Sequence, residues 1–335
     1  MKKNYWIMML CLLAGSFAGC SDDDDGPSWL EIFEKQQTLI ADFVKDKSPL
    51  KVFDYPFEYN GKKLIDYAYL FEYDGNGVTP KPGQFILVNY TQRNLDGNIL
   101  DSTYPPVAAG AKVTPYFEFG GPVYFQINDN NKYTDPTSEA WQLMAEGTTG
   151  SIILSSRMVA STTYLYREYK MEKIIQNESL LDYENELIDT YIGNKHISED
   201  DIIRFSADET NKNDTIARLV MSAYGEGQAV GATDSVTMWI EGEILDEFNS
   251  PLRKFMEMEK ESSTVTMKVS DLPTKGLRMA LVKLKENDEA ELLLPSGMGF
   301  GYEGGFNKLT LQCSVPPYST LLFKIKIKST KPSAK

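Results

Sequence analysis

A loop rich in glycine, proline and aromatic residues near the C-terminus holds the side chains best suited to form a ligand pocket. Phe300 lies among Gly297, Gly299 and Gly301, and Tyr318 follows two consecutive prolines. Large aromatic side chains in such a loop are typical of an apolar pocket or its rim. A pocket of this kind acts by removing a bound group from water rather than by attacking it with a nucleophile.

Other kinds of site find little support in the sequence. The segment Gly297–Gly301 lacks the lysine and the following helix of a phosphate-binding loop. His196 has no thiol or serine-triad partner nearby, which argues against zinc and serine-nucleophile chemistry. The segment Asn128–Asn131 lacks the central glycine and terminal glutamate of a calcium loop, so a surface turn is the better interpretation. We therefore expect no metal and no cofactor.

A helix and two strands should position the aromatic loop. Four apolar residues recur at the spacing of one helix face: Leu277, Ala280, Leu281 and Leu284. Glu289–Leu294 reads as a buried strand. Thr320–Ile327 reads as a second strand, because apolar and charged residues alternate through Phe323, Ile325 and Ile327.

This order of elements resembles the C-terminal half of the FKBP family of peptidyl-prolyl isomerases. The chain reads GLRMALVKLKENDEAELLLPSGMGFGYEGG and, after a short spacer, SVPPYSTLLFKIKIK. The family has a helix, a strand, a glycine and aromatic loop, Pro-Pro and a closing strand in the same order. The resemblance implies an antiparallel sheet wrapped on a short helix.

Two predicted helices, 151 residues apart, indicate an internal repeat. Ser28-Trp29-Leu30-Glu31 has the form of a capping box and should start a helix that runs to about Lys45. Ser179 starts a similar segment, with Gly193 as its predicted C-cap. A recurrence at this offset is typical of a duplicated unit.

Two predicted strand pairs repeat at nearly the same offset. Phe85–Ser102 aligns with Val236–Ser250, so that Tyr90 and Ile240 are equivalent and 150 residues apart. Asp96-Gly97 should form the hairpin turn in the first copy. The hairpin of the second copy should be two residues shorter. A further hairpin is expected before each pair, at 67–78 and 217–227.

The resemblance and the repeat together predict an α+β protein of two tandem FKBP-like units. Each unit should be a curved antiparallel β-sheet wrapped on a short α-helix and preceded by an N-terminal helix. The first unit should span 28–178 and the second 179–335. In the first, the helix at 139–147 and the closing strand at 164–169 flank an aromatic loop that is nearly absent.

An isomerase of this family would need no nucleophile or metal. Rotation about an X-Pro bond faces a barrier of about 18–20 kcal/mol that arises from amide resonance, and a dry pocket disfavours the polar planar amide. Carried onto the second copy, the resemblance implies catalytic positions at Phe248, Asn249, Thr274, Leu277, Phe300, Tyr318 and Phe323. It implies substrate-binding positions at Ile240, Val265 and Met267. Phe248 and Phe323 are equally compatible with an ordinary sheet core.

Both copies depart from the family pattern. In the second, Asn249, Ile240 and Leu277 replace an aspartate, a tyrosine and the tryptophan of the pocket floor. The first copy keeps Tyr90 and Asp101, with Tyr166 implied on the closing strand as a substrate-binding residue. It has Leu100, Thr137 and Ala160 where the family has Phe, Trp and Tyr. Trp141, four residues after Thr137, could partly refill the floor.

Two functions fit this pattern. One is an FKBP-type prolyl isomerase or folding factor of the cell envelope, with its activity mainly in the second copy. The other is a binding or chaperone module that holds proline-containing or apolar segments of envelope proteins without turnover. The retained aromatic loop favours the first function, and the replaced pocket residues favour the second.

The first residues are typical of a lipoprotein leader. Lys2 and Lys3 precede an apolar run, and Phe17-Ala18-Gly19-Cys20 resembles a lipobox in which Cys20 is acylated. We interpret 1–19 as a signal peptide and 20–27 as an acidic tether. The acidic run after Cys20 resembles an export signal to the outer face of the outer membrane, although a solvated tether explains it equally well. Anchoring in the outer membrane is therefore the expectation.

Charge and cysteine content limit the partners. The formal net charge of −14 argues against nucleic acid, because phosphate binding needs a basic surface. If Cys11 leaves with the leader and Cys20 carries lipid, Cys313 has no partner for a disulfide. Proline-containing segments of envelope proteins are the expected partners.

Overall fold

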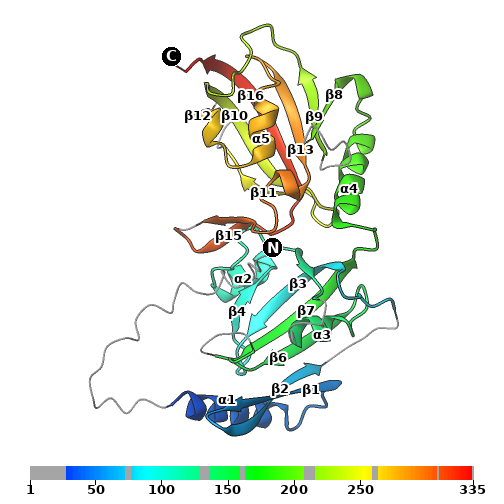
Figure 1. Cartoon of the computed structure of the whole chain (residues 1–335), viewed down its shortest axis with the longest axis vertical. Coiled ribbons are helices and arrows are strands. Elements are labelled where there is room, and N and C mark those ends of the chain that lie inside the picture. Colours follow the sequence, from blue (N-terminus) through cyan, green and yellow to red (C-terminus); the bar gives the residue numbers. More distant parts are fainter. Residues whose placement is uncertain are drawn as a thin grey trace, which may run out of the picture.

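The computed structural model describes residues 28–71, 77–128, 136–158, 163–206, 216–258, 263–307 and 309–333. They form two units stacked along the long axis of the molecule, each built on a seven-stranded sheet (Figure 1). The predicted α+β architecture of two tandem units is confirmed. None of the helices within these ranges is both long and apolar enough to cross a membrane.

The first unit begins with a long helix and continues into its sheet. Its elements are α1 (Trp29–Val44), β1 (Lys51–Tyr59), β2 (Lys62–Phe71), β3 (Phe85–Arg93), β4 (Ile99–Ser102), α2 (Pro105–Ala111), β5 (Val123–Gln126), α3 (Pro136–Trp141), β6 (Thr149–Leu154) and β7 (Leu165–Ile174).

The second unit repeats this plan without a helix between its fourth and fifth strands and adds a small hairpin. Its elements are α4 (Leu180–Asn194), β8 (Ile202–Ser206), β9 (Ile216–Ala223), β10 (Ser235–Ile244), β11 (Arg253–Met256), β12 (Val265–Lys268), α5 (Lys275–Leu281), β13 (Glu289–Leu294), β14 (Gly305–Asn307), β15 (Gln312–Val315) and β16 (Leu321–Lys331). Short 3-10 turns lie at Glu199–Asp201, Val269–Asp271 and Ser296–Met298.

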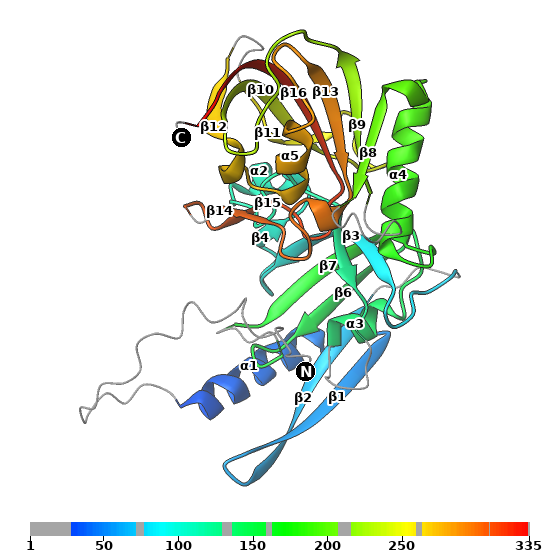
Figure 2. The same ribbon diagram turned by 45° about the horizontal axis from the view of Figure 1, so that its top comes forward.

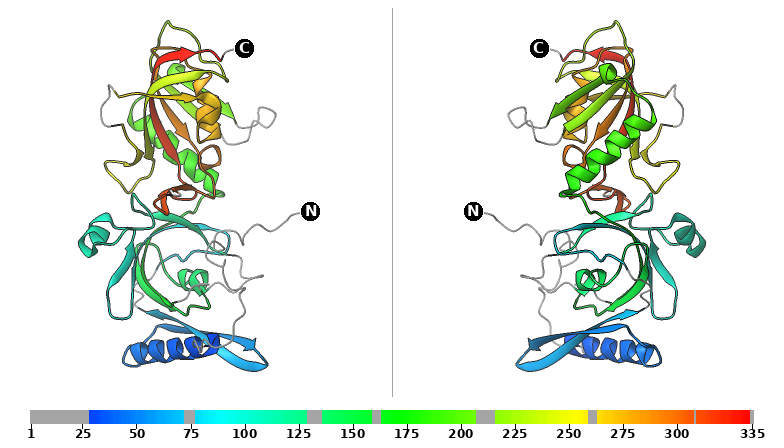
Figure 3. Two further views of the ribbon diagram at one scale, coloured as in Figure 1. Left: turned by 90° about the vertical axis from the view of Figure 1, so that its left-hand side faces the viewer. Right: turned by 90° about the vertical axis from the view of Figure 1, so that its right-hand side faces the viewer.

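The two sheets have the same strand order. It is β1-β2-β6-β7-β3-β4 in the first, with β5 also on β3, and β8-β9-β13-β16-β10-β11 in the second, with β12 also on β10. Each sheet curls around its short helix, α3 or α5, while α1 and α4 lie on the opposite faces (Figures 2 and 3). Each sheet therefore has two covered faces and two apolar layers.

Capping decides where the two long helices start. The Ser28 hydroxyl accepts a hydrogen bond from the backbone N–H of Glu31, and the Glu31 carboxylate accepts one from the N–H of Ser28, which is the predicted capping box. Ser179 caps α4 in the same way through the N–H of Asp182. The C-terminal prediction for α4 is wrong, because the helix continues through Gly193 and Lys195 is its C-cap.

Strand alternation builds the inner core of the second unit. Phe323, Ile325 and Ile327 of β16 point into that core, and Lys324 and Lys326 point to the other face. There Lys324 pairs with two glutamates of β10, Glu241 and Glu243. The predicted closing strand is thus confirmed together with the orientation of its side chains.

The predicted hairpins are displaced. A hairpin at 67–78 was expected, but β1 and β2 form it further upstream, where Asn60 and Gly61 both have positive φ and make the turn. Residues 72–76 lie outside the described part of the chain. In the second unit, β8 and β9 form the corresponding hairpin, rather than 217–227.

The small hairpin β14–β15 joins the two units. Cys313 of β15 forms a parallel bridge with Phe117 of the first unit. Its N–H donates to the carbonyl of Tyr116 at 2.7 Å, and its carbonyl accepts from the N–H of Glu118 at 3.0 Å. The Cys313 side chain packs in the core of the first unit, so this segment of the second unit is anchored to the first.

Candidate functional site

Three phenylalanines of the second unit meet edge to face on the inner side of its sheet. The Phe255 ring lies 6.2 Å from Phe300 and 5.6 Å from Phe323, centroid to centroid, and both pairs are T-shaped. Phe323 is fully buried, whereas Phe255 and Phe300 are half-buried. The group, which we call the aromatic cluster, therefore has a buried base and two partly open rings.

Three different elements supply the aromatic cluster. Phe255 comes from β11, Phe323 from β16, and Phe300 from the glycine-rich loop after the turn at 296–298. Gly242 of β10 is required beneath it, because a Cβ at that position would lie 2.6 Å from the Phe255 ring. The absence of a side chain at Gly242 thus allows the Phe255 ring to pack directly against the backbone of β10.

The sheet register shows which residues are equivalent in the two units. In the first unit, Gln92 of β3 is paired with Asp101 of β4. In the second, Gly242 of β10 is paired with Met256 of β11. Met256 therefore occupies the place of Asp101, and the residue before it, Phe255, occupies the place of Leu100.

This register corrects the placement of Phe248 and Asn249. The resemblance places them at the aromatic and aspartate positions of the family, which Phe255 and Met256 hold in the structure. Phe248 is 38% exposed and lies outside the aromatic cluster. The cause is the loop between β10 and β11, which spans 245–252 and is longer than the hairpin loop of the first unit, not two residues shorter.

The displaced segment helps to join the units. The Asn249 amide donates to Asp246, and Arg253 pairs with the same carboxylate at 2.9 Å with both side chains nearly inaccessible. Arg253 also donates to the carbonyl oxygens of Gly120 at 2.6 Å and Pro122 at 3.2 Å in the first unit. The polar side chains of this segment therefore stabilise the contact between the two units.

Most other predicted residues of the second unit lie around the aromatic cluster. One hydrophobic cluster contains Ile240, Val265, Met267, Leu277, Phe300 and Phe323. Thr274 is the N-cap of α5, where its hydroxyl accepts from the N–H of Leu277 at 3.2 Å. Tyr318 lies apart from them and packs against Phe85 of the first unit, with centroids 4.9 Å apart.

The first unit contains a polar pair at the corresponding place. The Tyr90 hydroxyl donates to Asp101 at 2.6 Å, and the N–H of Tyr116 donates to the other carboxylate oxygen at 2.9 Å. The Arg167 guanidinium stacks over the Tyr90 ring at 4.2 Å. Burial raises the pKa of Tyr90 well above its ordinary value, so the hydroxyl stays protonated and remains a donor.

Trp141 does fill the floor of the first unit. Its ring lies 5.0 Å from Phe125 and 5.4 Å from Tyr169, and only 4% of the residue is exposed. Its indole N–H is buried without a hydrogen-bond partner in the described part of the chain. Ala160, which stands at the expected place of the loop tyrosine, lies outside the described residues.

The closing strand of the first unit presents different side chains from those expected. Tyr166 points to the outer face and packs against Phe43 of α1, with centroids 5.6 Å apart. Tyr169 is the residue that faces Tyr90, at 6.2 Å. Arg167 is paired with Gln92, as Phe323 is paired with Gly242, so a cation replaces the buried aromatic residue.

No group of three or more histidine, cysteine, aspartate or glutamate side chains suited to a metal occurs in the described ranges. The free thiol of Cys313 is buried, and burial raises its pKa to about 12. It is therefore unsuited to nucleophilic attack at neutral pH. The chemistry available at the aromatic cluster is desolvation and shape.

Sequence reasoning missed Phe255, Tyr169 and Arg167. Phe255 could have been identified from the sequence, because it lies in a short Lys-Phe-Met segment that follows the loop and is suited to a strand with an aromatic residue. Tyr169 and Arg167 could not be separated from Tyr166, because neighbouring strand residues differ only in the face they occupy.

Residues 226–328 match the sequence family described as FKBP-type peptidyl-prolyl cis-trans isomerase. The matched region contains all three members of the aromatic cluster. No curated protein sequence matches the chain.

Three solved structures illustrate the structural similarity. A peptidyl-prolyl cis-trans isomerase from Pseudomonas syringae is 15% identical, covering 47% of this chain and 98% of its own, with a TM-score of 0.35. FkpA from Escherichia coli is 18% identical, covering 45% of this chain and 62% of its own, with a TM-score of 0.34. The three FKBP domains of wheat FKBP73 are 14% identical, covering 87% of this chain and 98% of their own, with a TM-score of 0.30.

Proposed function

We propose that this chain is an FKBP-type peptidyl-prolyl isomerase or folding factor of the cell envelope, with its active site at the aromatic cluster of the second unit. The observation that carries the proposal is the edge-to-face packing of Phe255 on Phe300 and Phe323, inside the region that matches the isomerase family. Two of these rings are partly open, so a proline ring can pack against them.

The proposed mechanism needs only the chain's own residues. Apolar side chains around Phe300 and Leu277 would take the prolyl amide out of water and disfavour its polar planar form relative to the twisted one. The backbone N–H of Thr274 would hold the substrate carbonyl. Acid or base catalysis, a metal and a cofactor are not part of this mechanism.

A second candidate function is binding without turnover. Ile240 and Met256 are apolar where the first unit has Tyr90 and Asp101, so these two positions cannot form a polar pair beside the aromatic cluster. Such a site would grip proline-containing or apolar segments of envelope proteins as a chaperone does. The two functions differ in turnover.

A protease-free prolyl isomerisation assay on the mature protein separates them. For an isomerase, Phe255→Ala and Phe300→Ala should each lower kcat/KM at least about tenfold, while Phe248→Ala stays within about twofold of wild type. Equal rates for all four proteins would remove the enzyme proposal. Binding of a proline peptide without acceleration would support the chaperone function.

We further propose that Cys20 carries a lipid that anchors the protein to the outer membrane, with the folded units turned toward the cell surface. The lipobox-like Phe17-Ala18-Gly19-Cys20 and the acidic run after it support this proposal; both lie outside the described residues. Metabolic labelling with a fatty-acid analogue should mark wild type and not Cys20→Ala. Loss of the protein to added protease on intact cells would support surface exposure, and full protection would contradict it.

A further inference from the structure

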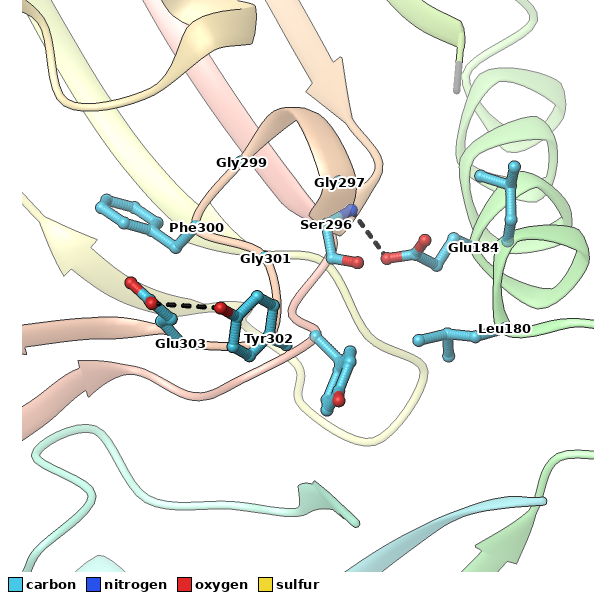
Figure 4. A pocket seen from close by; sticks show the side chains of 11 residues that line it. Leu180, Glu184, Ser296, Gly297, Gly299, Phe300, Gly301, Tyr302 and Glu303 are labelled. Atoms are coloured by element: carbon cyan, nitrogen blue, oxygen red, sulfur yellow. Dashed lines mark hydrogen bonds between the residues drawn. The ribbon is translucent and has the colours of Figure 1, made fainter. Parts of the chain in front are cut away.

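A cleft lies between the start of α4 and the loop after β13, on the side of that loop away from α5. Its volume is about 690 Å³. Figure 4 shows the side chains of α4 on one side and the loop on the other. It is lined by Leu180, Leu181, Glu184, Ser296, Gly297, Gly299, Phe300, Gly301, Tyr302, Glu303 and Tyr318.

Glu184 is the buried acid of this cleft, with only 2% of the residue exposed. One carboxylate oxygen, Oε1, accepts from the backbone N–H of Ser296 at 2.7 Å and from the Thr320 hydroxyl at 3.4 Å. The Ser296 side chain is a further hydrogen-bonding neighbour of this carboxylate. No lysine or arginine in those ranges pairs with Glu184.

A buried carboxylate without a cation is costly, because burial removes its hydration. Burial accordingly raises the pKa of Glu184 to about 7, against the lowering effect of the hydrogen bonds from Ser296 and Thr320. A cation in the cleft would favour the charged form and recover part of this cost. The geometric basis for a cation here is the cleft itself, which has Glu184 in its wall and no lysine or arginine in its lining.

Aromatic side chains add a second attraction for a cation. Tyr318 and the 66% exposed Tyr302 line the cleft, and the Tyr302 hydroxyl donates to Glu303 at 3.3 Å. Faces of aromatic rings attract ammonium and guanidinium groups. The cleft therefore combines two carboxylates with aromatic walls and no competing basic side chain in its lining.

Phe300 connects the cleft to the aromatic cluster. It lines the cleft and also packs on Phe255. We propose that the cleft binds the basic side chain, lysine or arginine, of the same polypeptide whose proline packs on the aromatic cluster. The identity of this ligand rests on the proposed function, and Glu184 is its anionic partner.

Short fluorescent peptides that contain Leu-Pro test the proposal. Two lysine peptides carry the lysine directly before or directly after Leu-Pro, and two matching peptides carry uncharged norleucine at the same position. Kd is measured by fluorescence anisotropy. Of the two lysine peptides, the one that binds wild type more tightly should have a Kd at least about tenfold lower than the norleucine peptide of the same design, which corresponds to about 1.4 kcal/mol. In Glu184→Gln the preference should fall below about twofold. Glutamine keeps an acceptor for the N–H of Ser296, and a single cooperative thermal transition checks that the variant is folded.

The matched control is Glu186→Gln, an exposed acid on the same helix outside the cleft. It should keep the full lysine preference. The inference would be overturned if wild type bound the lysine and norleucine peptides with equal Kd, or if Glu184→Gln kept the preference for lysine.

A probe without proline makes this result independent of isomerisation. N-acetyl-lysine amide should shift the Ser296 amide resonance of wild type and not that of Glu184→Gln, and N-acetyl-norleucine amide should shift neither. If the probe acts in this way but no proline peptide binds, the proposed function fails and the cation site stands. If proline peptides are isomerised without regard to lysine, the function stands and the cation site fails.

Discussion

Arg253 of the second unit donates to the carbonyl oxygen of Gly120 in the first, 2.6 Å away, while the same guanidinium holds the buried carboxylate of Asp246. One side chain thus satisfies an acid of its own unit and a backbone group of its neighbour. Because it is buried between them, the units cannot separate without exposing an ion pair and breaking these bonds.

Replacing Arg253 should therefore destabilise the whole protein. Arg253→Met leaves Asp246 buried without its cation, which we expect to lower the free energy of unfolding by about 3–5 kcal/mol. Arg204→Met, which breaks an exposed pair with Glu199, should cost less than about 1 kcal/mol. Urea denaturation measures both, and equal small losses would show that the buried pair contributes no more than a surface pair.

The phenylalanines of the second unit should differ sharply in their effect on catalysis. Phe255→Ala removes a ring that packs on both Phe300 and Phe323, so kcat/KM toward a proline peptide should fall at least about tenfold, or about 1.4 kcal/mol. Phe248→Ala lies outside the aromatic cluster and should change it less than twofold. A larger loss of kcat/KM in Phe248→Ala than in Phe255→Ala would place Phe248 in the active site and contradict the equivalence of Phe255 and Leu100.

The polar pair of the first unit should matter for stability rather than for the rate. Tyr90→Phe deprives Asp101 of one donor, with an expected cost of about 1–3 kcal/mol. Tyr302→Phe removes an exposed hydroxyl and should cost almost nothing. If activity resides in the second unit, kcat/KM should stay within about twofold in Tyr90→Phe; a large loss would move the active site to the first unit.

Glu184 should make stability depend on pH. Its pKa is about 7 in the folded protein and ordinarily 4.5, so the folded state holds the proton more tightly. The stabilising contribution is complete below pH 4.5 and declines as pH rises to about 7, by up to about 3 kcal/mol. The nearby Tyr124 hydroxyl has a pKa raised by burial and stays protonated in this window.

Urea denaturation of wild type and Glu184→Gln between pH 4.5 and 8 isolates that contribution. As pH rises, the free energy of unfolding of wild type should fall relative to that of Glu184→Gln. A difference that stays constant across the series would show that Glu184 is charged, or neutral, throughout.

Cys313 should report on the contact between the units. Because its pKa is about 12, alkylation at pH 8 should be about a thousandfold slower than for an ordinary exposed thiol, and should become fast in urea. Arg253→Met should speed it under native conditions by loosening the interface. Mass spectrometry of the peptide that contains Cys313 measures the rate, and rapid labelling of native wild type would contradict the packing against Phe117.

Local signals in the sequence were sufficient for much of the fold. The capping box at Ser28 and Glu31 fixed the start of α1, because the groups that satisfy each other lie three residues apart. The alternation through Phe323, Ile325 and Ile327 fixed the inward face of β16 for a similar reason, since strand side chains alternate with period two. The duplicated plan followed from the offset of about 150 residues between equivalent segments.

Only the tertiary structure decided which residues meet at the site. The loop at 245–252 moved the aromatic position from Phe248 to Phe255, and loop length does not follow from strand patterns. The choice of Tyr169 over Tyr166 depended on register, where a shift of one residue exchanges the two faces of a strand. The packing of Cys313 into the first unit depended on contacts between segments almost 200 residues apart. Such contacts are set by how apolar surfaces and hydrogen bonds are satisfied in three dimensions, and no local pattern in the chain encodes them.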